Sequence, residues 1–155
     1  MIFGTRAIVT LVVIVTIVLL AACGGGDAGS ASLTLTDDDC TYEGNESPPA
    51  TQTFSAELEN QSSKLGAFEI ARIDAGGTFA DVEAYVESER RRLAESFEIV
   101  GPPAFLTLMT RAAVPPSDGG MLVATLRPGE YVLWCAHEHP PTAVFLVTPP
   151  LEVSE

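Results

Sequence analysis

Five residues in this chain are of types that commonly carry chemistry: three cysteines and two histidines. Cys23 directly follows an apolar run, Cys40 lies seventeen residues later, and Cys135, His137 and His139 alternate near the C-terminus. Thiolates and imidazoles are ligands for zinc and copper. An imidazole can also serve as the base that activates a nucleophile. The chemical alternatives are therefore a modified thiol, a disulfide, a metal site or hydrolysis.

The first 22 residues are typical of an export signal. Arg6 is followed by the run 7–20, which is apolar apart from two threonines. This run is shorter than the roughly 20 residues that a membrane-spanning helix needs. The quartet Leu20-Ala21-Ala22-Cys23 resembles the lipobox of bacterial lipoproteins. The resemblance implies cleavage before Cys23 and a lipid on its sulfur; an ordinary cleaved signal and an uncleaved anchor are the alternatives.

The sequence therefore predicts three parts: a lipoprotein signal peptide at 1–22, a lipidated cysteine and flexible tether at 23–32, and one folded domain at 33–155. Lys and Arg total 8 and Asp and Glu total 21, which gives a net charge of −13. This charge excludes a nucleic-acid partner, because phosphate binding needs a basic surface. It also makes the lipid on Cys23 the expected contact with the membrane, on the extracytoplasmic side.

Two cysteines remain once Cys23 is lipidated, and an even number in an exported domain favours a disulfide. Cys40 and Cys135 would enclose a loop of about 95 residues, whose closure is worth roughly 4–5 kcal/mol of chain entropy. A zinc-like site made of Cys40, Cys135, His137 and His139, a copper centre, and free thiols are the alternatives.

Most of the predicted domain consists of short apolar segments separated by turns. Alternation is clear around Leu33 and in the segment 54–59, and the turn signals include Asp118-Gly119-Gly120 and Pro128-Gly129. Short strands punctuated in this way predict a β-sandwich or barrel. The remaining predicted strands lie at 68–71, 105–114, 121–126, 131–136 and 143–147, and around 151–153.

One segment, Thr78 to Phe97, has helical periodicity instead. Its apolar face consists of Phe79, Val82, Val86, Leu93 and Phe97. Thr78 with Asp81 fits a capped helix start, and Glu87–Arg91 and Arg91–Glu95 fit i,i+4 ion pairs. The basic run at 90–92 is interpreted as a solvated helix face, with an anion or partner site as the alternative.

The stretch from Leu126 to His137 resembles the last hairpin of cupredoxin-like domains, in which a Pro-Gly turn leads to a strand with Tyr, Cys and His. These are Pro128-Gly129, Tyr131, Cys135 and His137 in this chain. The resemblance implies a Greek-key β-sandwich with an inserted helix; an immunoglobulin-like sandwich is the rival.

A blue-copper centre needs two histidines and a cysteine thiolate, usually with a weak methionine ligand. No His precedes His137 and no Met follows Cys135. If the extended chain places Cys135, His137 and His139 on one face, one local strand must supply all three donors. The resemblance places the missing donor in the region 68–74, which offers Glu69, Arg72 and Asp74. The sequence therefore predicts no copper centre; His137-Glu138-His139 remains as a weak surface metal site.

Together these patterns predict a non-enzymatic surface lipoprotein that acts as a binding or structural module, without a cofactor. Its partner would be a protein or a small molecule. The alternative is a copper-binding or electron-transfer cupredoxin with the atypical ligands Cys135, His137 and His139. A hydrolase that uses His137 or His139 is disfavoured, because no nucleophile lies at a recognisable spacing.

Overall fold

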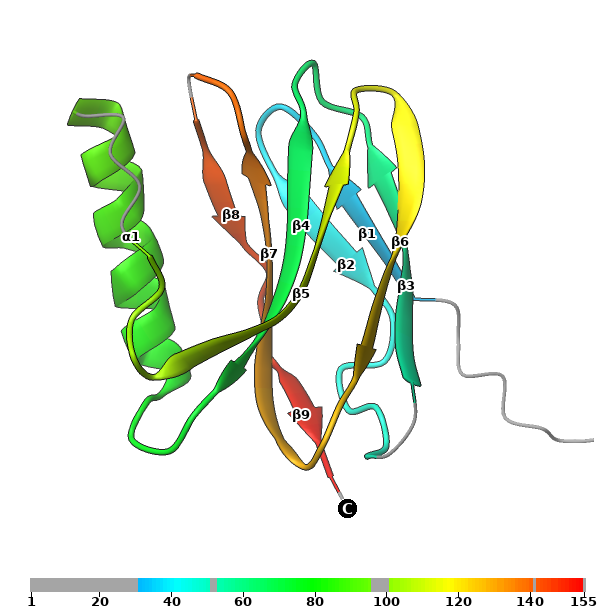
Figure 1. The fold of residues 1–155 in the computed structure, drawn as a ribbon, viewed down its shortest axis with the longest axis vertical. Helices are drawn as coiled ribbons and strands as arrows, with labels where there is room; N and C mark the ends of the chain where they lie inside the picture. The colour runs from blue at the N-terminus through cyan, green and yellow to red at the C-terminus, as the bar shows by residue number, and fades with distance from the viewer. Residues whose placement is uncertain (1–30, 51–52, 96–100, 141, 155) are drawn as a thin grey trace, which may run out of the picture.

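The computed structural model describes residues 31–50, 53–95, 101–140 and 142–154. In these residues nine strands form two sheets that pack face to face, and one helix covers the outer face of the second sheet (Figure 1). The predicted signal peptide, Cys23 and Phe97 lie outside the described residues. The layers are therefore first sheet, second sheet and helix.

The first sheet holds four strands in the order β2-β1-β3-β6, with β1 parallel to β3 and the other pairs antiparallel. Burial alternates along β3, because one face packs on the second sheet and the other faces water. Ala31 and Ser32 already pair with β3, so the last two residues of the predicted tether (23–32) belong to the folded domain. The strand bounds are Ala31–Leu35 for β1, Cys40–Glu43 for β2, Thr53–Asn60 for β3 and Asp118–Thr125 for β6.

The second sheet has the order β5-β4-β7-β8, and β9 also pairs with β7. The chain crosses between the sheets from β3 to β4, from β5 to β6 and from β6 to β7. This is the architecture expected of the cupredoxin-like class: mainly β, two sheets in Greek-key order, one inserted helix. The strand bounds are Gly66–Ile73 for β4, Leu106–Val114 for β5, Gly129–His137 for β7, Val144–Leu146 for β8 and Leu151–Val153 for β9.

Strand β7 is buried on both faces. Tyr131, Leu133 and Cys135 pack into the core between the sheets, whereas Val132 and Trp134 pack beneath the helix. A strand in the middle layer must be apolar at consecutive positions, which explains its uninterrupted hydrophobic sequence.

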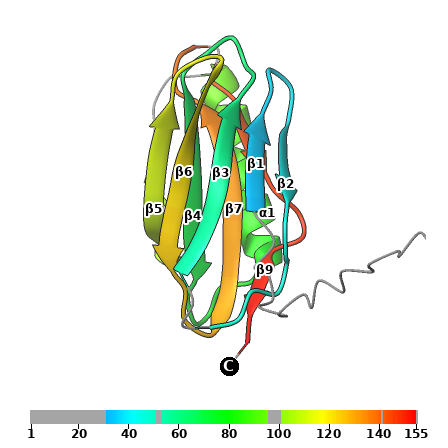
Figure 2. The same ribbon diagram turned by 90° about the vertical axis from the view of Figure 1, so that its right-hand side faces the viewer.

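Helix α1 (Phe79–Glu95) packs on β8 and its neighbours behind the sandwich (Figure 2). Thr78 and Asp81 form the predicted cap: the Thr78 N–H donates to Asp81 Oδ2 at 2.9 Å, and the Asp81 N–H donates to Thr78 Oγ1 at 3.2 Å. Val82, Val86 and Leu93 are buried as predicted. Among the described residues, no helix is long and apolar enough to cross a membrane.

One of the two predicted ion pairs on α1 is replaced by another, and the second is not described. Glu87 pairs with Arg90 rather than Arg91, at 3.8 Å, because residues three apart on a helix are also neighbours. Arg90 Nε additionally donates to the carbonyl of Val144 at 2.7 Å, so this arginine ties the helix to β8. The Arg91–Glu95 pair lies outside the described side chains.

The predicted turn at Asp118-Gly119-Gly120 is wrong. These residues begin β6 and pair with Asn60, Glu59 and Leu58 of β3. The turn lies just before them, where Ser117 has φ of 59°. A Cβ atom on Gly119 would lie 3.0 Å from the Leu58 carbonyl oxygen, so this glycine permits close approach of two strands rather than a turn.

Candidate functional site

The stretch from Cys135 to His139, which offers the alternative metal ligands, does not keep its three donor side chains on one face. Cys135 and His137 share the face of β7 that points into the sandwich core, and His137 is only 1% exposed. β7 ends at His137, and His139 follows in an exposed bend. The side-chain alternation of a strand stops where the strand stops. The structure therefore separates His139 from the other two donors, and His137 belongs to no surface pair.

Cys135 is bonded to Cys40 in a disulfide, with 5.8 Å between the two Cα atoms. The bond links β2 of the first sheet to β7 of the second, across 95 positions of sequence. The predicted disulfide is thus formed. A disulfide sulfur is not the thiolate that a copper or zinc site uses.

The His137 ring is held by its surroundings in the core. Nε2 lies 3.1 Å from the carbonyl oxygen of Thr36, and because a carbonyl only accepts, Nε2 carries the hydrogen. The ring meets Phe145 edge to face, with 5.4 Å between centroids. Among the described residues, Nδ1 is buried without a hydrogen-bond partner. The imidazole is therefore part of the packing between the sheets.

The polar residues of the region 68–74 do not lie directly opposite Cys135 or His137 in the sheet. β4 runs antiparallel to β7, so Gly66 lies opposite His137 and Phe68 lies opposite Cys135. Glu69 and Arg72 are opposite Trp134 and Tyr131, farther from the end of β7. Within the described chain, no three His, Cys, Asp or Glu side chains are placed to hold a metal ion. With Cys135 bonded to Cys40, the stretch 135–139 offers no free thiolate of the kind that a blue-copper centre uses.

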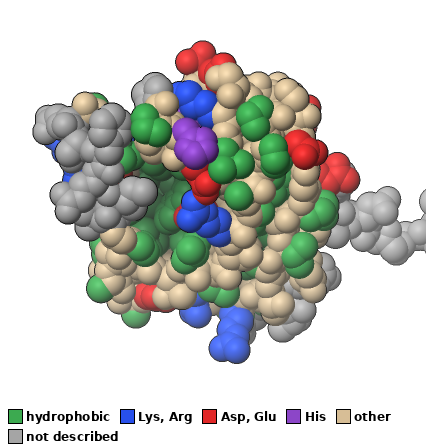
Figure 3. Space-filling model, turned by 45° about the horizontal axis from the view of Figure 1, so that its top comes forward, with side chains coloured by type: hydrophobic (Ala, Val, Ile, Leu, Met, Phe, Trp, Pro, Cys, Tyr) green, Lys and Arg blue, Asp and Glu red, His purple; other side chains and the backbone are tan. Residues whose placement is uncertain are grey.

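A different site lies on the other face of β7. A cleft of about 420 Å³, here called the helix cleft, separates part of α1 from the second sheet. In Figure 3, hydrophobic side chains line a hollow beside acidic and basic ones. Its apolar wall is formed by aliphatic side chains of the helix and sheet, and two aromatic rings complete it. These residues are Tyr85, Val86, Leu93, Leu108, Trp134, Ala136 and Val144.

One side of the helix cleft carries a chain of polar contacts across the sheet. The Trp134 indole N–H donates to Glu69 Oε2 at 2.7 Å. Glu69 Oε1 lies 3.2 Å from Arg111 Nε, and Arg111 also pairs with Glu138. The side chain of Glu69 is 15% exposed and that of Arg111 is 49% exposed, so the network runs from the wall to the mouth of the cleft. Trp134 is thereby fixed in one orientation.

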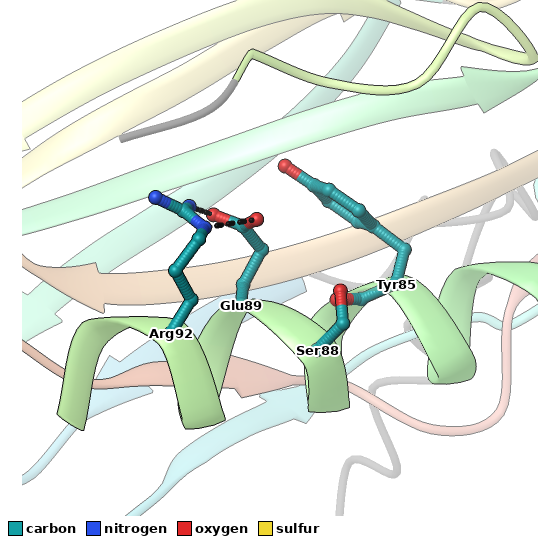
Figure 4. Close-up of polar contacts among 4 residues, drawn as sticks. All are labelled: Tyr85, Ser88, Glu89 and Arg92. Atoms are coloured by element: carbon teal, nitrogen blue, oxygen red, sulfur yellow. Dashed lines mark hydrogen bonds and ion pairs between the residues drawn. The ribbon is translucent and has the colours of Figure 1, made fainter. Parts of the chain in front are cut away.

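The helix supplies the opposite wall (Figure 4). Glu89 and Arg92 form an ion pair in which Arg92 Nε donates to Glu89 Oε1 at 3.2 Å. Tyr85 lies one turn earlier on the same face of α1. Burial raises the pKa of the Tyr85 phenol above its usual 10.0, and the nearby charge of Glu89 raises it further. The hydroxyl therefore stays protonated at neutral pH and can donate a hydrogen bond.

Sequence reasoning missed this cleft as a site. The sequence feature that could have indicated the cleft is an acidic residue within the apolar face of the helix. Glu89 lies three residues after Val86 and four residues before Leu93. A carboxylate at such a position is buried only if it has a partner or a function. Nothing in the linear sequence shows that Glu69 and Arg111 face the same space.

No protein-family model matches the sequence, and no curated protein matches it. Solved structures that are similar in fold include two auracyanins. The dithionite-reduced auracyanin from the photosynthetic bacterium Roseiflexus castenholzii is 22% identical over 78% of this chain and 100% of its own, with a TM-score of 0.42. An auracyanin B is 19% identical over 77% of this chain and 88% of its own, with a TM-score of 0.43.

Proposed function

We propose that this chain is a lipid-anchored, extracytoplasmic protein whose cupredoxin-like domain is a non-enzymatic binding module without a blue-copper centre. The observation that carries the proposal is the helix cleft. Its volume of about 420 Å³ lies within the range of roughly 300–1,000 Å³ that is usual for small-molecule sites. Mostly apolar walls with a few fixed polar groups are typical of such sites.

The disulfide supports the part of the proposal that concerns copper. With Cys135 bonded to Cys40, the strongest ligand of a blue-copper centre is occupied. His139 is exposed beyond the end of β7, whereas His137 is held in the core by Thr36 and Phe145. The electron-transfer alternative would require reduction of the disulfide and rearrangement of this end of the sandwich.

The charged groups around the cleft support recognition rather than catalysis. Glu69, Glu89 and Glu138 each take part in an ion pair or hydrogen bond with a neighbouring side chain. Groups locked in this way hold a ligand in one orientation but are poorly placed to exchange protons with it. No enzymatic role is therefore assigned to them.

A neutral hydrophobic dye, N-phenylnaphthylamine, tests the binding role of the cleft. The purified domain should bind it saturably with enhanced dye emission. A Val144→Trp variant, which fills the cleft, should abolish binding, whereas Val123→Trp on the exposed face of β6 should not. Equal dye binding by both variants would contradict the assignment.

Titration with Cu(II) tests the copper part separately. The oxidised domain should give no intense visible absorption, because a coloured copper–thiolate bond needs a free thiolate. A stoichiometric coloured complex that disappears in Cys135→Ser would overturn this part and favour electron transfer.

A further inference from the structure

We propose that the helix cleft selects a small organic cation, that is, a protonated amine or quaternary ammonium carried on an apolar body. This inference rests on the proposed function, in which the cleft is the binding site, and adds the chemical class of its ligand.

The first support is the charge of the lining. Among the described residues that line the cleft, three are carboxylates and one is a guanidinium, which gives 1 − 3 = −2 with His137 taken as neutral. Counting Arg92, which pairs with Glu89 on the helix, the sum is still 2 − 3 = −1. A cation therefore gains from the local field, whereas an anion is repelled from a partly buried space in which water screens charge weakly. The three carboxylates are Glu69, Glu89 and Glu138.

The second support is the pair of aromatic rings that line the same space as these acids. The faces of Trp and Tyr attract cations electrostatically, and sites for quaternary ammonium ligands are commonly built from them. Trp134 is anchored to Glu69 through its indole N–H, so the ring needs no ordering when a ligand arrives. Tyr85 adds a second ring and a protonated hydroxyl from the helix side.

The third support is the apolar wall, which suits the body of the ligand rather than its head. Leu93 and Leu108 border the cleft from the helix and from β5, and Leu108 is 44% exposed. An exposed leucine beside an acidic rim offers contact area to an apolar group. A bare metal ion or a small inorganic cation would leave this wall uncovered.

The overall charge of −13 acts in the same direction. An acidic surface raises the local concentration of cations and speeds their encounter with a cleft of the same sign. The cleft lies behind the second sheet, whereas the described chain begins in the first sheet, on the other side of the sandwich (Figure 1).

Three ligands of one shape test the inference: phenylbutylamine, phenylbutanol and phenylbutyrate. Trp134 is the single tryptophan of the chain, so its fluorescence reports occupancy of the cleft directly. At neutral pH the amine should bind about tenfold more tightly than the alcohol, which corresponds to the strength of a partly desolvated cation–aromatic contact. The carboxylate should bind most weakly, and added salt should reduce the preference for the amine.

Variants identify the source of the preference. Glu89→Gln and, at the mouth, Glu138→Gln should each weaken amine binding severalfold while leaving alcohol binding unchanged. Glu83→Gln is the matched control, because Glu83 lies on the same helix and faces solvent. Circular dichroism of each variant confirms that the fold is retained.

The outcomes separate this inference from the proposed function. If the alcohol or the carboxylate binds as tightly as the amine, the selection of cations is overturned while a binding cleft remains. If none of the three ligands and no neutral dye binds, both proposals are wrong.

Discussion

A single buried asparagine organises the end of the sandwich near the disulfide. Asn60 is fully buried, and its Nδ2 donates to the carbonyl oxygens of Lys64 and Val114 at 2.8 and 2.7 Å. Its Oδ1 accepts from the N–H and hydroxyl of Ser62 at 3.0 and 2.6 Å. One side chain thus satisfies groups from the β3–β4 connection and from β5. Gly66 leaves room for it, since a Cβ there would lie 3.0 Å from Nδ2.

Asn60→Asp should destabilise the domain by about 2–4 kcal/mol, because the new carboxylate loses both donors and faces two carbonyl oxygens. Urea unfolding at neutral pH measures this loss. Asn45→Asp, in an exposed turn, is the control and should change stability little. Equal stabilities of the two variants would mean that the Asn60 contacts are not essential.

Asp37 should contribute to the loss of folding stability at acid pH. The N–H and hydroxyl of Ser63 donate to its Oδ1 at 2.8 and 2.9 Å, and these hydrogen bonds lower the pKa of the carboxyl below 3.8. The carboxylate therefore stabilises the fold above about pH 3.8, and this contribution disappears as the pH falls through the lowered pKa. Asp37→Asn should flatten the decline of stability in this window, as measured by urea unfolding at a series of pH values.

The disulfide should account for a large part of the stability. The bond joins residues 95 positions apart in sequence. Its loss raises the conformational entropy of the unfolded chain, which lowers the free energy of unfolding by about 4–5 kcal/mol. Cys40→Ala and Cys135→Ala should therefore both unfold at lower urea concentration than the oxidised protein. Reduction of the wild type should bring its midpoint close to theirs. Alkylation of both cysteines without reductant would contradict the bond.

At the scale of elements, α1 is stabilised mainly by tertiary contact. Its cap and its ion pairs contribute tenths of a kcal/mol to about 1 kcal/mol each. Val82 and Val86 are 0% and 2% exposed against the second sheet, and burial of such side chains contributes about 1.5–3 kcal/mol each. The helix forms one wall of the cleft only because this stripe fixes its position.

Val86→Asp should therefore destabilise the domain by about 3 kcal/mol or more, since it removes apolar burial and places a charge beneath the helix. Arg91→Ala, on the exposed face, should change stability by no more than about 0.5 kcal/mol. Chemical unfolding of both variants, together with their affinity for the neutral dye, measures the comparison. Similar effects would show that α1 does not depend on this contact.

At the scale of the whole molecule, the two sheets and the helix contribute different features to the domain. The first sheet contains the first described residues of the chain, the two sheets together enclose the core and the disulfide, and the helix forms one wall of the cleft. The proposed lipid attachment and the proposed ligand site therefore involve different layers of the domain.

Cys23→Ser should abolish lipid attachment and shift the protein from the membrane to the soluble fraction. Because Cys23 precedes the folded domain, the variant that is recovered should keep the dye affinity and urea midpoint of the wild type. Intact mass and membrane fractionation are the measurements. Fractionation of the variant with membrane to the same extent as the wild type would contradict the lipoprotein proposal.

The strand pattern, the capped helix and the pairing of Cys40 with Cys135 could be predicted because each depends on local periodicity or on counting. Alternation marks β3, and helical spacing marks Val82, Val86 and Leu93. The predicted domain contains two cysteines, which leaves one pairing. The predicted turn at Asp118 failed because pairing with β3 outweighs the turn preference of Asp and Gly. The expectation that an extended chain places Cys135, His137 and His139 on one face failed because the strand ends at His137.

The sequence by itself determined the class of fold, the acidic character and the expected extracytoplasmic location of this protein, since these follow from composition, periodicity and a short N-terminal motif. Only the tertiary structure decided where its candidate site lies. Glu69, Arg111 and Trp134 come from three strands and Glu89 from the helix, and the packing of α1 on the second sheet brings them around one space. Contacts between residues far apart in sequence are set by register and layer packing, which local patterns do not encode.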